Sequence, residues 1–215
     1  MKKLTSALIL AMAMVSVAKA DENTGYRVTI TNATANQVIT PALVITHNKN
    51  FKLFSVGSPA SNGLAHQAEN GDPSLVYGEV VNAHGVKDVK TGSGVVLPGH
   101  SESIDIMASK KSLLTFTAML ASSNDAFAAL NAVKLPGNKK TYFAYAYDAG
   151  SEMNNENCSY VPGPPCSGDS GNARTEISEG FVSIHNGIHG SNDLAPKQLD
   201  WRGPVAIITI ERLDN

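Results

Sequence analysis

The stretch that decides the fold is LLTFTAMLA, residues 113–121. Its side chains divide between two faces, as they do on a β-strand, where successive side chains point to opposite sides of the sheet. One face holds Leu114, Phe116, Ala118 and Leu120, and the other holds Leu113, Thr115, Thr117 and Met119. No other segment of the chain predicts a strand as strongly.

Further strands are predicted on both sides of this one. Alternating, β-branched or aromatic segments lie at residues 26–31, 38–47, 101–107, 141–147, 181–185 and 204–213. Pro41 marks an edge or a bulge in the second of them. Ser58-Pro59 and Asp72-Pro73 are helix-start signals, and they predict two short helices joined at Gly71.

The order of these elements predicts an all-β fold. Residues 122–133, SSNDAFAALNAV, predict a turn with at most a short helix, and residues 86–100 predict a Gly-rich turn. Seven or eight short strands separated by turn clusters indicate an antiparallel β-sandwich, with the two helices as an insertion in one connection. A parallel α/β arrangement would require helices between the later strands, and the second half of the chain has none of useful length.

The N-terminus has the pattern of a secretory signal peptide. Lys2 and Lys3 precede an apolar stretch at residues 7–17, and Ala18-Lys19-Ala20 matches the small-x-small cleavage pattern. The alternative is a transmembrane anchor, but a span takes about 20 apolar residues and this run is shorter. We therefore expect residues 1–20 to be removed and residues 21–215 to form one exported domain, in the bacterial periplasm or outside the cell. No other apolar run would make the mature chain an integral membrane protein.

The charge and cysteine content narrow the possible functions. The chain has 17 Lys and Arg and 19 Asp and Glu, and the signal segment takes three of the lysines, so the mature net charge is about −5. Such a surface, without a basic cluster, does not favour nucleic acid. Cys158 and Cys166 are the two cysteines, and an oxidising compartment favours a disulfide that closes a short loop. A zinc site at these two cysteines is not expected, because no further cysteine is available as a ligand.

Two acids follow the strand predicted at residues 141–147. In YDAGSE, residues 147–152, Asp148 leaves the strand and Gly150 permits a turn that brings Glu152 back toward it. Two close carboxylates repel each other, and a divalent cation relieves the repulsion. Oxygen ligands favour Ca²⁺. Asp125, in the loop after the strand predicted at residues 113–121, is a third candidate ligand if that strand neighbours the one at residues 141–147. The alternative is that all three acids are ordinary solvated loop residues.

Several segments resemble the spondin N-terminal domain family in its bacterial form. They are TAMLASSNDAFAALNAVKLP, YAYDAGSE, the cysteine loop, EGFVSIHNGIHG and DWRGPVAIITIERL, which together extend the resemblance over residues 26–213. The resemblance implies a C2-like β-sandwich with one calcium site, whose ligands correspond to Asp125, Asp148 and Glu152. The chain departs from the animal pattern in having Glu as the last acid and no aromatic residue directly after the first. Glu is a competent, longer ligand.

The histidines offer a second candidate metal site. His185 and His189 have the H-x3-H spacing of zinc ligands on a helix, and Asp193 could supply a third ligand. Glycines interrupt the segment, so the alternative that both imidazoles bond backbone groups in a loop is favoured. Asp200-Trp201-Arg202 is expected to anchor the last strand.

The sequence therefore predicts an exported calcium-binding β-sandwich with a non-catalytic binding, adhesion or structural role. Its partner would be a protein, a glycan or a lipid. One alternative is a metal-dependent enzyme of the cell envelope, although no GxSxG elbow or other nucleophile motif is present. The other is a C2-like module that binds lipid through calcium, and it predicts exposed apolar or basic loop tips beside the site.

Overall fold

The computed structural model describes residues 23–109, 111–166, 175 and 177–213, so the predicted signal peptide lies outside the described residues. The strands are β1 (Thr24–Asn32), β2 (Leu43–His47), β3 (Val86–Thr91), β4 (Ser101–Ala108), β5 (Leu113–Met119), β6 (Ala126–Lys134), β7 (Lys139–Asp148), β8 (Ser183–Ile184) and β9 (Ala206–Arg212). The helices are α1 (Asn62–Asn70), α2 (Ser74–Val80) and α3 (Pro196–Leu199), with a 3-10 turn at Cys158–Tyr160.

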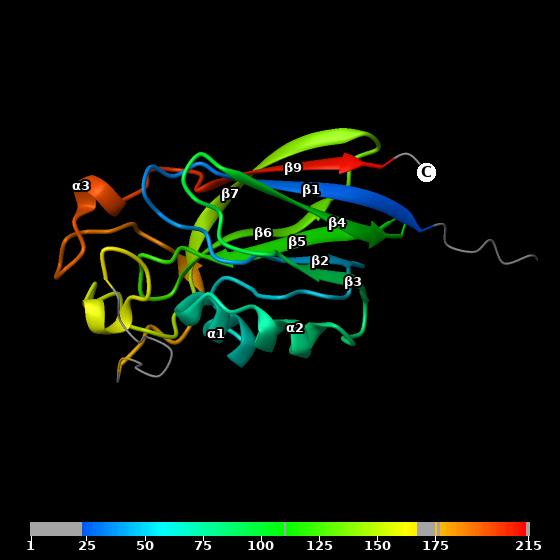
Figure 1. Cartoon of the computed structure of the whole chain (residues 1–215). Helices are drawn as coiled ribbons and strands as arrows, with labels where there is room; N and C mark the ends of the chain where they lie inside the picture. Colours follow the sequence, from blue (N-terminus) through cyan, green and yellow to red (C-terminus); the bar gives the residue numbers. More distant parts are fainter. Residues whose placement is uncertain (1–22, 110, 167–174, 176, 214–215) are drawn as a thin grey trace, which may run out of the picture.

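The strands form an antiparallel β-sandwich, as predicted (Figure 1). Their order is β3-β2-β5-β6-β7-β9-β1-β4, and β8 adds to β7. Strand β7 belongs to both halves, because residues 139–144 pair with β9 and residues 145–148 pair with β6. The sheet therefore folds over along β7, and its inward-facing side chains form one core that includes Val28, Phe116 and Ile208.

Side chains nearly close the sheet where β3 and β4 approach each other. The Asp88 carboxylate accepts a hydrogen bond from the Met107 amide at 2.9 Å, and the Thr46 hydroxyl donates to the Met107 carbonyl at 2.6 Å. These bonds satisfy backbone groups of β4 that have no neighbouring strand on this side. They also limit the exposed edge, which would otherwise invite pairing with another chain.

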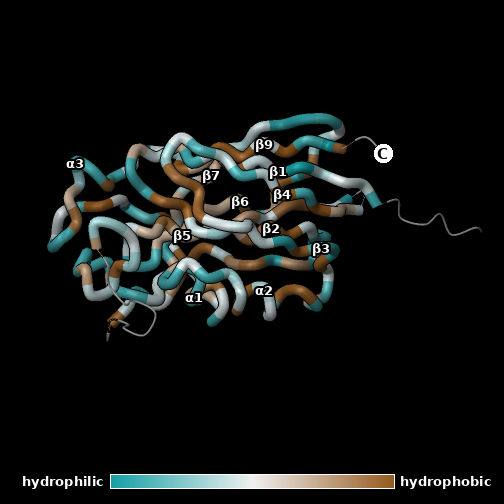
Figure 2. Tube along the Cα trace, in the orientation of Figure 1, coloured by the Kyte–Doolittle hydropathy of each residue, from teal (hydrophilic) through white to brown (hydrophobic). Residues whose placement is uncertain are grey.

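The two predicted helices are confirmed, and they cover the outer face of β2, β5 and β6 (Figure 1). Leu64 of α1 packs against Phe127, and Val76 of α2 packs against Ile45. This cover buries β5 on both sides, and the threonines on its outer face have hydrogen-bond partners, such as Gln67 of α1 for Thr117. Figure 2 shows hydrophobic residues running through the strands of the sandwich, interrupted by hydrophilic ones. Gly71 ends α1 in the left-handed conformation, with a φ of 73°.

Two predictions for individual segments were wrong. Most of residues 122–133 do not form a turn or helix, because Ala126–Lys134 form β6 between β5 and β7. Alanine, leucine and asparagine give this segment little strand propensity, and pairing on both sides overrides it. Residues 86–91, expected in a turn, form the edge strand β3. The Cys158–Cys166 disulfide is present, and no helix of the described residues is long and apolar enough to cross a bilayer.

Candidate metal centre

The β6–β7 ladder brings two of the predicted acids together. Asp125 immediately precedes β6, and Asp148 ends β7 as the cross-strand partner of Ala126. The Ala149 amide also donates to the Asp125 carbonyl at 3.2 Å. Asp125 was expected to join the other acids only if the strand at residues 113–121 neighboured that at residues 141–147. Instead β6 lies between them, and Asp125 belongs to the start of this intervening strand.

The turn after β7 wraps around the Asp125 carboxylate. Asp125 Oδ2 accepts hydrogen bonds from the amides of Ser151 and Glu152, at 2.8 and 3.0 Å. The Gly150 amide donates to Asp148 Oδ1 at 2.6 Å. Gly150 has a φ of 66°, and a Cβ there would collide with the backbone of Phe181, so the turn requires glycine. Asp125 is thus the hub that holds residues 151–152 against the start of β6.

The three acids are buried. The exposed fractions of Asp125, Asp148 and Glu152 are 0%, 4% and 1%. Burial and, second, the nearby Asp148 carboxylate raise the pKa of Asp125 to about 7. Burial also raises the pKa of Asp148, against the hydrogen bonds from Asn154 and Gly150. No Lys or Arg of the described residues forms an ion pair with Asp125 or Asp148, so the charge of the pair is not balanced by these residues.

One oxygen of this cluster lacks a partner. Asp125 Oδ1 is buried and accepts no hydrogen bond from the described residues, although an unsatisfied buried charged group is costly. A hard cation would satisfy this oxygen and offset the repulsion between the two aspartates, so the residues fit Ca²⁺ chemically. A complete shell is not preassembled: the described part of the chain holds no group of three His, Cys, Asp or Glu side chains in a metal-binding arrangement.

The family of the chain follows from a comparison of its sequence with known families. The model of the family described as Spondin_N matches residues 32–159, more than half of the chain, and the match includes Asp125, Asp148 and Glu152. The chain belongs to the spondin N-terminal domain family. No curated protein matches the sequence at a significant level. In this spondin domain the matched segment ends before β8 and β9, which complete the sandwich.

In this spondin domain, His185 and His189 each contact other groups of the protein. The Gly187 amide donates to His185 Nδ1 at 3.0 Å, so His185 Nε2 bears the proton and donates to Asn154 Oδ1 at 3.0 Å. Burial lowers the pKa of His185 to about 4, so the ring is neutral. His189 Nε2 lies 3.1 Å from a backbone carbonyl, and Asp193 Oδ2 accepts the Cys158 amide. These contacts favour the loop interpretation over zinc binding.

Asn154 and Glu156 are site residues that sequence reasoning missed. Asn154 links Asp148 to His185: its side-chain NH2 donates to Asp148 Oδ2, and its Oδ1 accepts from His185 Nε2. Glu156 is buried with a φ of 55°, and its two carboxylate oxygens accept the amides of His189 and Ser191, at 2.6 and 2.7 Å. Neither residue stands at a recognisable spacing from the aspartates. Their roles arise from contacts with a loop about 30 residues later in the chain.

The disulfide-closed loop packs directly against the turn that holds Asp125. The Gly163 amide donates to the Ala121 carbonyl at 2.8 Å, and the Ser122 hydroxyl donates to the Pro164 carbonyl. In the following loop Asp200 accepts hydrogen bonds from Arg202 and from the Ile188 amide, so it holds the segment at residue 188 rather than β9, the strand that it was expected to anchor. Figure 1 shows these loops gathered with α3 at one end of the sandwich. The acids therefore lie at a well-supported end of the molecule.

Proposed function

We propose that this spondin domain is an exported calcium-binding module that acts by binding a partner rather than by catalysis. The observation that supports the proposal most strongly is the buried Asp125 carboxylate, which has Asp148 beside it and one oxygen that accepts no hydrogen bond from the described residues. Asp125, Asp148 and Glu152 would hold the ion. When bound, Ca²⁺ supplies positive charge at the end of the sandwich where the described residues supply none to the two aspartates.

The chain's own residues explain why such an ion would order this end. Asp125 already links the start of β6 to the Ser151 and Glu152 amides. Asp148 links the end of β7 to Asn154 and through it to His185. Lowering the electrostatic repulsion between the two aspartates therefore stabilises both connections together. The gain in stability depends on the free ion concentration relative to its dissociation constant.

The surroundings of the acids favour a binding role. Met153, Phe181 and Ile184 lie next to the turn and to β7, with exposed fractions of 39%, 45% and 56%. Tyr145 and Phe143 continue this exposed apolar surface along the outer face of β7. Contiguous exposed apolar side chains on a water-soluble surface commonly mark an interaction site. A protein, a glycan or a lipid would meet the domain here.

The burial of the three acids favours a binding role over catalysis. A catalytic carboxylate must reach a substrate, whereas the exposed fractions of these three side chains are 4% or less. A lipid-binding role has one observation in its favour, the apolar side chains beside the turn. The acidic net charge expected of the mature chain does not favour an anionic membrane at this end. The proposal therefore gives a protein or glycan partner precedence over a lipid.

Thermal melting tests the calcium site. The mature chain is melted in EDTA and then with Ca²⁺ or Zn²⁺ added in excess, and Ca²⁺ is expected to raise the Tm while Zn²⁺ is not. The increase should disappear in Asp148→Asn and persist in Asp105→Asn, a matched control whose carboxylate is exposed and paired with Arg27. An unchanged Tm of the unmodified chain in Ca²⁺ would remove the calcium site from the proposal.

Export is a separate part of the proposal and has its own test. The Cys158–Cys166 disulfide supports an oxidising compartment, and the N-terminal pattern supports cleavage after Ala20. Mass spectrometry of the protein recovered from the cell envelope or medium should give a chain that begins at Asp21. A chain that retains Met1 and the first apolar segment would contradict export by cleavage.

A further inference from the structure

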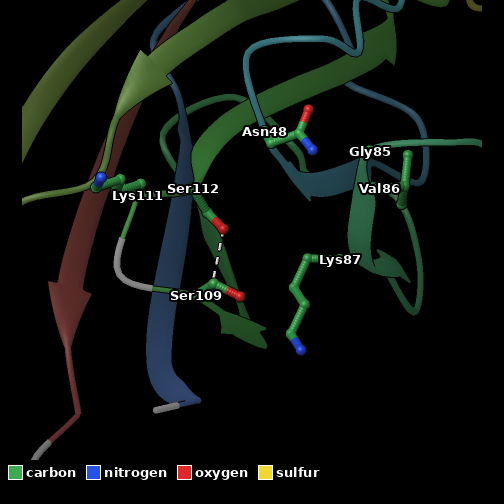
Figure 3. Close-up of a pocket in the computed structure, with 7 residues that line it drawn as sticks. All are labelled: Asn48, Gly85, Val86, Lys87, Ser109, Lys111 and Ser112. Carbon is green, nitrogen blue, oxygen red and sulfur yellow. Dashed lines mark hydrogen bonds between the residues drawn. The ribbon is translucent and has the colours of Figure 1, made fainter. Parts of the chain in front are cut away.

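The end of the sandwich opposite the acids holds two neighbouring hollows. The larger, of about 520 Å³, is lined by Asn48, Gly85, Val86, Lys87, Ser109, Lys111 and Ser112 (Figure 3). The second, of about 260 Å³, is lined by Lys111, Ser112, Leu113, Lys134 and Leu135. Leu113 pairs with Lys134 at one end of the β5–β6 ladder and Met119 with Phe127 at the other, which separates the hollows from the acids by about 20 Å.

The charges lining these hollows are all positive. Among the described residues, three lysines and no acid contribute to the two linings, in a chain that has more acids than bases overall. Lys87, Lys111 and Lys134 are exposed, and none forms an ion pair with a described residue. The neighbouring acids are committed elsewhere: Asp88 pairs with Lys90, and Glu211 with Lys139. The lysine charges are therefore available to an anionic ligand.

The larger hollow also has neutral donors without partners. Asn48 uses Oδ1 to accept the Asn50 amide, which leaves Asn48 Nδ2 without a partner among the described residues. The Ser109 amide donates to Ser112 Oγ at 3.1 Å, and the Ser109 hydroxyl is itself without a described partner. In Figure 3 the side chains of Asn48, Lys87 and Ser109 border the same opening, while Lys111 extends away on the far side of the turn.

The backbone holds these donors in place. The Asn48 amide donates to the Gly85 carbonyl at 2.8 Å, which fixes the end of β2 to the start of β3. Gly85 has a φ of 92°, and a Cβ there would meet the Asn48 side chain at 2.7 Å. The side chain of Asn48 thus lies over Gly85, where both the positive φ and this close approach require glycine. The Ser112 amide closes the other side by donating to the Ser109 carbonyl at 2.9 Å.

We propose that this end of the domain binds phosphate groups, with Lys87, Ser109 and Asn48 around one oxyanion and Lys111 and Lys134 available to a second. Ammonium, hydroxyl and amide N–H groups are the donors that phosphate oxygens accept, and no carboxylate in the linings opposes them. The phosphate would come from a soluble phosphate ester or from an anionic lipid headgroup. This site is independent of the calcium site and faces the opposite way.

Two assays test the proposal and separate the two sources. Glycerol phosphate is titrated into the mature chain in EDTA and followed by NMR chemical shifts. Cosedimentation then uses phosphatidylcholine vesicles with and without phosphatidylglycerol. Lys87→Gln should weaken binding of glycerol phosphate about two- to fivefold. Lys87→Gln with Lys111→Gln should weaken binding to the phosphatidylglycerol vesicles, whose headgroups offer a second phosphate, about tenfold. Lys197→Gln, which removes the same charge from the exposed surface of α3 outside the hollows, should leave binding unchanged.

Each outcome decides a point. Binding of glycerol phosphate without sedimentation assigns a soluble phosphate, and sedimentation that requires phosphatidylglycerol and the two lysines assigns a lipid headgroup. Absence of both, or equal loss in Lys197→Gln and Lys87→Gln, would overturn the site and show at most a diffuse charge effect. Because both assays are done in EDTA, their failure is distinct from failure of the calcium proposal.

Discussion

Replacing Asp125 with asparagine should stabilise the protein in the absence of calcium. The substitution keeps the shape of the side chain and an oxygen that can accept the Ser151 and Glu152 amides. It removes a negative charge that is fully buried beside Asp148. In most proteins the loss of a buried hydrogen-bonded carboxylate is destabilising, so an increase in stability is a specific consequence of the electrostatic repulsion at this site.

The size of the effect follows from the pKa. A carboxyl whose pKa is raised on folding loses stability as the pH rises from its unfolded pKa, about 4, through its folded pKa, about 7 for Asp125. At pH 8 the penalty for ionised Asp125 is on the order of 4 kcal/mol, and at pH 5 it falls to about 1–2 kcal/mol. Asparagine avoids this penalty, so Asp125→Asn should melt on the order of 10 °C higher at pH 8 in EDTA.

The assay is thermal and urea unfolding of the mature chain and of Asp125→Asn, in EDTA at pH 8 and at pH 5. The difference between them should shrink at pH 5. Saturating Ca²⁺ at pH 8 should raise the Tm of the unmodified chain and leave that of Asp125→Asn unchanged. Asp105→Asn, on the exposed surface, serves as the control. If Asp125→Asn is less stable than the unmodified chain in EDTA at pH 8, the repulsion that we infer is not present.

Three further predictions concern other parts of the domain. The pKa of His185 is lowered to about 4, so the folded state favours the neutral ring, and stability should fall by about 3 kcal/mol as the pH drops from 6.5 to about 4. In urea titrations His185→Gln should flatten this pH dependence, and an unchanged slope would contradict the prediction. Replacing Cys158 and Cys166 with serine should lower the free energy of unfolding, measured by chemical denaturation, by about 2.5 kcal/mol. It should also weaken calcium binding, because their loop packs on the turn before Asp125, and an unaltered calcium affinity would show that the loop does not support the site. Phe127→Ala should cost about 3–5 kcal/mol, since the ring is fully buried between β6 and α1, and a cost below about 1 kcal/mol would argue against that packing.

The sequence predicted those elements whose own residues determine them. Residues 113–121 carry large apolar side chains on both faces and were predicted as the strongest strand, and β5 is buried on both sides, by the helices and by the core. The helix expected from Ser58-Pro59 begins later, with Ser61 as its N-cap, and it ends at Gly71 as expected. Strand β6 was missed because its alanines and asparagine have little strand propensity of their own, and it forms a strand by pairing with β5 and β7 on its two sides.

The same limit applies to the candidate site. The turn at Gly150 and the resemblance to the family predicted Asp125, Asp148 and Glu152, and the structure brings the first two together and ties the third to Asp125 through its amide. Asn154 and Glu156 could not be found from spacing, because they contact His185 and the amides of His189 and Ser191. Long-range contacts of this kind leave no local pattern in the sequence.

The most direct measurement is a calorimetric titration of Ca²⁺ into the metal-free mature chain. Because the pKa of Asp125 is about 7, binding near that pH should displace a proton, which two buffers of different ionisation enthalpy will reveal. We predict one ion per chain, proton release below pH 7, and no binding in Asp125→Asn or Asp148→Asn. Binding with unaltered affinity in both variants, or no binding in the unmodified chain, would contradict the account.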